Sequence, residues 1–142
     1  MNIYFIGSIR GGRSHQPTYA LIVRVLKQHG TVSSQYVSDS ALSEYGETRL
    51  TDREIFERER VALEKCDVVV ADVTTPSLGV GYLIARATFL KKNVVALYNG
   101  EDTMRLSAMI KGSPEVEVHT YKTEEDIVRI LKEALPSGLS WQ

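Results

Sequence analysis

The chain has 142 residues, of which 43% are hydrophobic and 25% charged, and a formal net charge of −1. This length predicts a single domain with a buried core. The nearly neutral charge argues against general nucleic-acid binding, and no apolar run is long enough to span a membrane. The chain does not begin with a basic segment followed by an apolar stretch, so the sequence predicts a cytoplasmic protein.

The cysteine and histidine content excludes two further classes. The single cysteine, Cys66, cannot form an internal disulfide, and its position before an apolar run predicts a packed side chain. No spacing of cysteine and histidine resembles a zinc site. A zinc site is therefore not expected, and we predict neither a metal nor a cofactor.

The first predicted strand, residues 3–6, ends in a glycine-rich basic loop. Gly7 and Gly11 allow backbone N–H groups to approach a phosphate, Ser8 adds a hydroxyl donor, and Arg10 can bind two phosphate oxygens. The spacing fits neither the dinucleotide fingerprint nor the P-loop. From this loop alone, an anion site and an ordinary glycine turn with a solvated arginine both remain open.

Helix and strand patterns alternate along the rest of the chain. Apolar residues recur at helical spacing from Pro17 until Gly30, and Thr51 with Glu54 forms the capping-box pattern that begins another helix. The continuous apolar run 67–72 is typical of a strand covered on both faces. In chain order, the elements predicted after the first loop are helix 17–29, strand 32–37, loop 38–50, helix 51–65, strand 67–72, helix 78–91, strand 93–98, short helix 104–110, strand 116–121, helix 123–135 and a tail, 136–142.

This alternation predicts an α/β domain over residues 1–135, with helices on both faces of a five-stranded, doubly wound parallel sheet. We expect the flavodoxin-like strand order 2-1-3-4-5, in which ligands bind at the carboxyl ends of the first and third strands. Those ends carry the loops 7–13 and 72–81, and the second loop begins a helix whose N-terminus favours an anion. The convergence of the two loops favours a phosphate site.

Four segments, in order along the chain, carry a resemblance to a known family: residues 4–13, 67–74, 76–82 and 106–110. Together they resemble the 2'-deoxynucleoside 5'-monophosphate N-glycosidases of the nucleoside 2-deoxyribosyltransferase superfamily. The resemblance implies hydrolysis of the bond between base and deoxyribose, by attack of a carboxylate on the anomeric carbon followed by water. It also implies a homodimer with shared sites and a small-molecule nucleotide as substrate.

The resemblance also implies roles for individual residues. Tyr4 corresponds to a tyrosine near the sugar and the nucleophile. Glu59 corresponds to an acidic residue, commonly aspartate in the family, that positions the substrate and moves protons. The serine matching Ser107 completes the phosphate pocket of the partner subunit. The substrate-binding residues implied in this way are Gly7, Ser8, Ile9, Arg10, Gly11, Ser77, Gly79, Ser107 and Met109.

One position departs from the family pattern. The family motif continues Gly-Tyr-Glu, and that glutamate is the nucleophile, but this chain has Leu83 there. Leucine can neither form the glycosyl intermediate nor stabilise a developing cation. Val80, Ile84 and Ala87 share its helical spacing, so a leucine also fits a core-facing stripe. Three explanations remain open: a natural loss or alteration of activity, a deliberate substitution, or a site in which another carboxylate has taken over.

The other acidic residues have ordinary roles as well. Glu59 shares its helix with several arginines and fits an ion-paired surface, while Asp72 fits a turn. Two further functions stay open: a nucleoside 2-deoxyribosyltransferase that passes deoxyribose between bases, and a non-catalytic nucleotide-binding module. Arg10 argues against the transferase because a nucleoside has no phosphate, whereas Leu83 makes the binding module credible.

Overall fold

The computed structural model describes residues 1–9, 16–33 and 50–135. Arg10 and Gly11 lie outside these residues. So do the predicted tail 136–142, nearly all of the predicted loop 38–50, and residues 34–37 of the second predicted strand.

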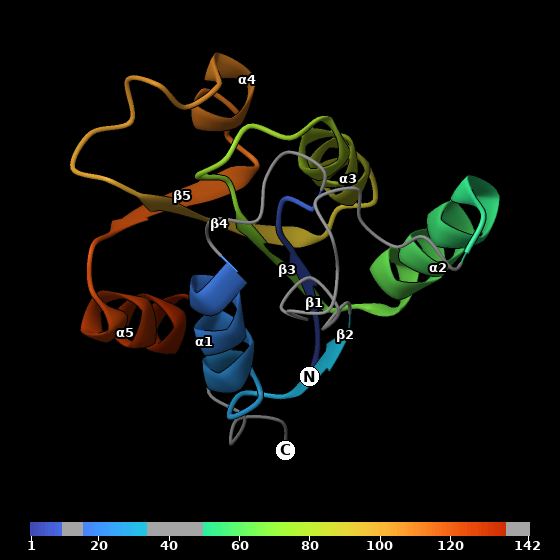
Figure 1. Cartoon of the computed structure of the whole chain (residues 1–142), viewed down its shortest axis with the longest axis horizontal. Helices are drawn as coiled ribbons and strands as arrows, with labels where there is room; N and C mark the ends of the chain where they lie inside the picture. Colours follow the sequence, from blue (N-terminus) through green and yellow to red (C-terminus); the bar gives the residue numbers. More distant parts are fainter. Residues whose placement is uncertain (10–15, 34–49, 136–142) are drawn as a thin grey trace.

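A five-stranded parallel sheet forms the centre of the described structure (Figure 1). Its strand order, β2-β1-β3-β4-β5, is the predicted one, with the switch in direction between β1 and β3. The register places Ile3 beside Val68, and Val68 beside Asn93. The strands are β1 (Asn2–Ile6), β2 (Thr31–Ser33), β3 (Val68–Asp72), β4 (Asn93–Asn99) and β5 (Val116–Tyr121).

Helices cover both faces of this sheet (Figure 1). Successive strand residues point to opposite faces, which divides the core into two clusters. In β1, Ile3 and Phe5 pack with side chains of α1 and α5, whereas Tyr4 and Ile6 pack with side chains of α2 and α3. The helices are α1 (Gln16–Leu26), α2 (Asp52–Lys65), α3 (Leu78–Phe89), α4 (Ala108–Lys111) and α5 (Glu124–Ala134).

Two of the predicted helix starts are confirmed in atomic detail. The Thr51 hydroxyl accepts a hydrogen bond from the Glu54 amide, and the Glu54 carboxylate accepts one from the Thr51 amide. Thr123 and Asp126 form the same reciprocal pair at the start of α5. Each cap satisfies amides that the first helical turn leaves unpaired, and is worth about 1 kcal/mol.

Three predicted helix boundaries were wrong by two or more residues. α1 ends at Leu26 and passes through a turn to Gly30, where a Cβ atom would lie 2.2 Å from the Met1 carbonyl oxygen. α3 ends at Phe89 because Lys91 adopts a left-handed conformation, with φ of 60°, without a glycine to mark it. α4 begins at Ala108, after Ser107, so residues 104–107 of the predicted short helix are not helical.

The boundaries of the last strand, by contrast, agree with the prediction at both ends. Within the described residues, no helix combines the length and apolar character that crossing a membrane would require.

Candidate functional site

The loop after β1 contains a buried polar group. A Cβ atom on Gly7 would lie 2.9 Å from the ring of Tyr19, so glycine allows this loop to pack closely on α1. The Ser8 amide donates a hydrogen bond to the Tyr19 hydroxyl at 3.2 Å, and Ile9 packs against the core. The Ser8 side chain is wholly buried, yet its hydroxyl has no hydrogen-bond partner among the described residues. An unpaired buried hydroxyl costs about 1–3 kcal/mol, and a bound ligand would relieve that cost.

The loop after β3 leads into the N-terminus of α3. The Ser77 hydroxyl accepts a hydrogen bond from the Val80 amide at 3.3 Å and caps the helix. Gly79, in the first turn, is exposed, and a Cβ atom there would come no closer than 3.8 Å to the Ser77 hydroxyl. Packing within the described residues therefore does not require glycine at this position, which leaves the backbone open to a ligand.

A pocket of about 420 Å³ lies beside this helix start. Hydroxyl side chains of Thr74, Thr75 and Ser77 line one part of it, and Arg105 and Ser107 line another. The Ser107 hydroxyl caps α4 by accepting from the Met109 amide at 3.2 Å. The other side chains of the lining are apolar, so these hydroxyls and the guanidinium are the groups of the pocket that could bind an anion.

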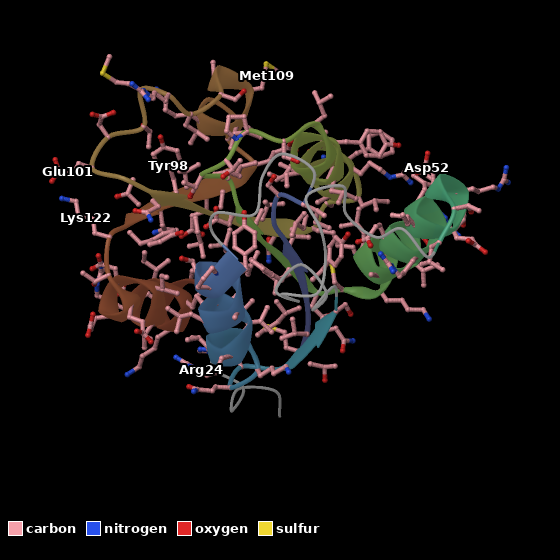
Figure 2. The ribbon with its side chains drawn as sticks, viewed as in Figure 1. Arg24, Asp52, Tyr98, Glu101, Met109 and Lys122 are labelled. Carbon is pink, nitrogen blue, oxygen red and sulfur yellow. The ribbon has the colours of Figure 1, made fainter. Side chains whose placement is uncertain are left out.

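Met109 does not share this pocket with Ser107. Its side chain is 82% exposed and lies at α4, at the outer edge of the molecule (Figure 2). The structure thus brings Ser77 and Ser107 of one chain to the same pocket and leaves Met109 outside its lining.

The three predicted catalytic positions lie on the α2 and α3 side of the sheet. The buried Tyr4 hydroxyl donates a hydrogen bond to the carboxylate of Glu59 on α2. Arg58 pairs with the other oxygen of that carboxylate at 3.2 Å, and the Glu59 side chain is 12% exposed. Leu83, on α3, is partly buried against the core cluster that contains Tyr4. The structure therefore couples Tyr4 to Glu59 and places an apolar side chain at position 83.

Cys66 is packed, as predicted. Its side chain is 2% exposed, and its thiol donates a hydrogen bond to the Leu63 carbonyl oxygen at 3.1 Å. Burial raises the pKa of the Cys66 thiol to about 11, so the reactive thiolate is scarce at neutral pH.

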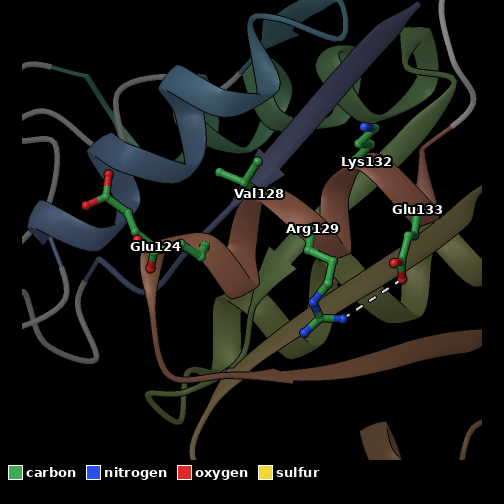
Figure 3. A pocket seen from close by; sticks show the side chains of 6 residues that line it. Glu124, Val128, Arg129, Lys132 and Glu133 are labelled. Atoms are coloured by element: carbon green, nitrogen blue, oxygen red, sulfur yellow. Dashed lines mark ion pairs between the residues drawn. The ribbon is translucent and has the colours of Figure 1, made fainter.

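A larger, shallow hollow of about 800 Å³ lies over α5 (Figure 3). Glu124, Val128 and Lys132 line it, together with Arg129 and Glu133, which pair at 4.0 Å. Its charges are mixed and exposed, and it includes no predicted site residue. Among the described residues, no group of three or more histidine, cysteine, aspartate or glutamate side chains could hold a metal ion.

Residues 3–129 match the model of a family described as nucleoside 2-deoxyribosyltransferase. The chain belongs to this family. It is 44% identical over 136 residues to the 5-hydroxymethyl-dUMP N-hydrolase of Danio rerio, with 94% of each chain covered. It is 41% identical over 144 residues to the protein of the same name from Mus musculus, covering 96% of this chain and 83% of that one.

A solved structure shares the fold of this nucleoside 2-deoxyribosyltransferase family member. The CMP N-glycosidase of Clostridium botulinum superposes with a TM-score of 0.63 at 15% identity, over 95% of this chain and all of that one. The predicted family resemblance and fold class are therefore confirmed. The family match includes the loops after β1 and β3, and also Tyr4, Glu59 and Leu83.

Sequence reasoning missed two features of this family member's site. It did not include Arg105, which lines the pocket. The only sequence signal was a basic residue two positions before Ser107. It also did not foresee that Asp72 is completely buried and bonded to Tyr121, although the predicted turn contact is present, with the Asp72 carboxylate accepting from the Thr74 amide. A contact between residues 49 positions apart leaves no local pattern in the sequence.

Proposed function

We propose that this protein is a hydrolase of N-glycosidic bonds that releases the base from 2'-deoxynucleoside 5'-monophosphates. The observation that carries the proposal is similarity over nearly the whole chain, at 41–44% identity, to proteins named N-hydrolases of a deoxynucleotide. The anion-binding character of the two loops supports it, since a nucleotide offers a phosphate and a nucleoside does not.

The phosphate, in this proposal, binds between the loop after β1 and the N-terminus of α3. The unpartnered Ser8 hydroxyl and the open backbone at Gly79 support this placement. Arg10 adds a bidentate cation, and Arg105 adds positive charge at the pocket. The helix N-terminus contributes further N–H donors and a favourable dipole.

We further propose that hydrolysis by this chain is weak because Leu83 stands where the resemblance places the nucleophile. An apolar side chain cannot form a glycosyl bond or stabilise an oxocarbenium-like transition state. The Tyr4–Glu59 pair is the alternative source of a carboxylate. In this proposal, its hydrogen bond orients Glu59 toward the sugar and the base rather than toward solvent.

A homodimer is the proposed assembly, with α3 as its contact surface. Leu78, Tyr82, Ala85 and Phe89 recur at intervals of four, three and four residues along α3, and all four are exposed. Exposure reaches 96% at Leu78 and 85% at Phe89, and Leu78 also lines the pocket. A second copy packed here would lie next to the pocket, whose lining already includes Ser107 of the same chain.

Light scattering tests this assembly. Phe89→Lys should convert the dimer to a monomer because it places a charge in the apolar contact, at the end of α3. Val128→Lys is the matched control, since Val128 is an exposed apolar residue on α5, away from α3. A monomeric unsubstituted protein that binds nucleotide with full affinity would contradict the proposal.

The cytoplasmic location stays a prediction.

Product analysis tests the reaction. The protein is incubated with a deoxynucleoside monophosphate, with and without a second free base. We expect free base and deoxyribose 5-phosphate in both cases, slowly for this chain and rapidly for Leu83→Glu. A new nucleotide that forms only when the second base is present would indicate a transferase. Binding without turnover, even for Leu83→Glu, would indicate a binding module.

A further inference from the structure

A buried carboxylate at the end of β3 has no part in the proposed chemistry. The Asp72 side chain is wholly buried. One of its oxygens accepts a hydrogen bond from the Tyr121 hydroxyl at 2.7 Å, and the other accepts from the Thr74 amide at 3.0 Å. A buried carboxylate is costly unless it is hydrogen-bonded. These two contacts therefore constrain the positions of Thr74 and Tyr121 around Asp72.

The contacts of Asp72 connect three strand ends to one loop. Asp72 is the last residue of β3, Tyr121 is the last residue of β5, and β4 lies between them. The Thr74 hydroxyl accepts a hydrogen bond from the Asn99 amide, at the end of β4, at 2.9 Å. Thr74 also lines the pocket. Thr74, at the start of the loop that leads to Ser77, is thus fixed by two hydrogen bonds: its amide bonds Asp72, and its hydroxyl bonds Asn99.

The same cluster reaches the first loop through Tyr19. The Tyr19 hydroxyl accepts from the Ser8 amide, and its ring lies against Gly7. Tyr19 is also close enough to Tyr121 to contribute to the raised pKa of that residue. Burial, followed by the charge of Asp72, raises the pKa of the Tyr121 hydroxyl well above its usual value. Tyr121 therefore remains a hydrogen-bond donor to Asp72 at neutral pH.

We propose that Asp72 is a positioning residue for nucleotide binding, which holds the loop 73–77 in the path that presents the N-terminus of α3 to the phosphate. The inference rests on the proposed phosphate site. Asp72 acts through the Thr74 amide and the Tyr121 hydroxyl and does not touch the substrate. Without it, the loop loses its buried anchor, and Ser77 and the first amides of α3 move away from the positions that a phosphate requires.

Calorimetry on four variants tests the proposal, with one deoxynucleoside monophosphate and the matching nucleoside as ligands. Asp72→Ala should weaken monophosphate binding by about tenfold relative to nucleoside binding. Asp72→Asn should retain most of the affinity, since its carbonyl oxygen can still accept from the Thr74 amide. Tyr121→Phe, which removes only a hydroxyl, should give an intermediate loss and decides the question if Asp72→Ala fails to fold.

The control is Ile130→Val, a buried residue of α5 in the core cluster that also contains Tyr121. It should lower the Tm without changing the ratio of the two affinities. If Asp72→Ala and Tyr121→Phe also lower only the Tm, the cluster serves stability and the positioning role is wrong. If the unsubstituted protein binds nucleoside and monophosphate equally, the phosphate site itself is wrong, and the positioning role falls with it.

Discussion

On one face of the sheet, α1 and α5 bury aliphatic and aromatic side chains together with a hydrogen-bonded pair, Asp72 and Tyr121. On the other face, α2 and α3 also cover a core, but α3 leaves Leu78 and Phe89 almost fully exposed. The first face buries the Asp72 carboxylate with hydrogen-bond partners. The second face turns an apolar helix surface outward.

The exposed surface extends to an aromatic cluster between α2 and α3. Phe56 and Tyr82 lie 6.3 Å apart between ring centroids, and the Arg86 guanidinium lies 5.5 Å and 5.8 Å from the two rings. Contiguous exposed apolar side chains of this kind mark interaction surfaces. The α1 and α5 face mainly provides stability, whereas the α2 and α3 face carries the proposed dimer contact and the Tyr4–Glu59 pair.

The largest effect is expected from adding a carboxylate to the α2 and α3 face. Leu83→Glu should raise base release from deoxynucleoside monophosphates on the order of a thousandfold, since a positioned carboxylate supplies both a nucleophile and the charge opposite the developing cation. Partial burial would raise the pKa of that new carboxyl, so the gained activity should decline in acid as it becomes protonated. Release of free base is measured across pH.

Leu83→Gln is the matched control, because glutamine has the same size as glutamate and no charge. One outcome would contradict the account of a missing nucleophile. If the unsubstituted protein already turns over rapidly and Glu59→Gln abolishes the reaction, then Glu59 is the catalytic carboxylate.

The next prediction compares the stability that each face provides. Ile130→Ala, on α5, should lower the free energy of unfolding by about 2–5 kcal/mol, because the side chain is 2% exposed and leaves a cavity. Phe89→Ala, on α3, removes a larger side chain but should change the free energy of unfolding of the monomer by less than about 0.5 kcal/mol. Urea unfolding at low protein concentration measures both. Equal losses would mean that the α3 surface is packed within the chain.

A smaller effect should separate binding from stability at the end of β1. Ser8→Ala should weaken binding of a deoxynucleoside monophosphate about tenfold, which is about 1.4 kcal/mol, because the phosphate loses a hydroxyl donor. The free energy of unfolding should not fall, since this hydroxyl has no partner among the described residues. Calorimetry and urea unfolding together test this. A loss of stability with unchanged affinity would show that the hydroxyl has a structural role.

The smallest effect concerns the core beneath α2 and α3. Between pH 9 and pH 11 the unfolded Cys66 thiol loses its proton while the folded thiol keeps it, because burial raises its pKa from 9.0 to about 11. Stability should therefore fall as pH rises, by at most about 1.4 kcal/mol per pH unit from this group. Urea unfolding at pH 7, 9 and 10 should show a shallower decline for Cys66→Ala. Identical slopes would mean that this core admits water.

Local patterns in the sequence determined the fold class and much of the architecture. Alternating strand and helix periodicity predicted the order of the strands, because a parallel sheet with short connections permits few arrangements. The capping box at Thr51 was readable because a helix start depends on residues three apart, and the helix start at Thr123 was likewise predicted. The family resemblance was likewise visible in the sequence, since its motifs are contiguous segments.

Only the tertiary structure decided which side chains meet. The Tyr4–Glu59 bond joins residues 55 positions apart, and the bond between Asp72 and Tyr121 joins residues 49 positions apart. Arg105 became part of the pocket because the segment before α4 returns beside the start of α3. Such contacts depend on how whole elements pack, and no short-range spacing encodes them. For the same reason, the sequence predicted the local turn contact of Asp72, which bonds the Thr74 amide, but not its burial or its bond to Tyr121.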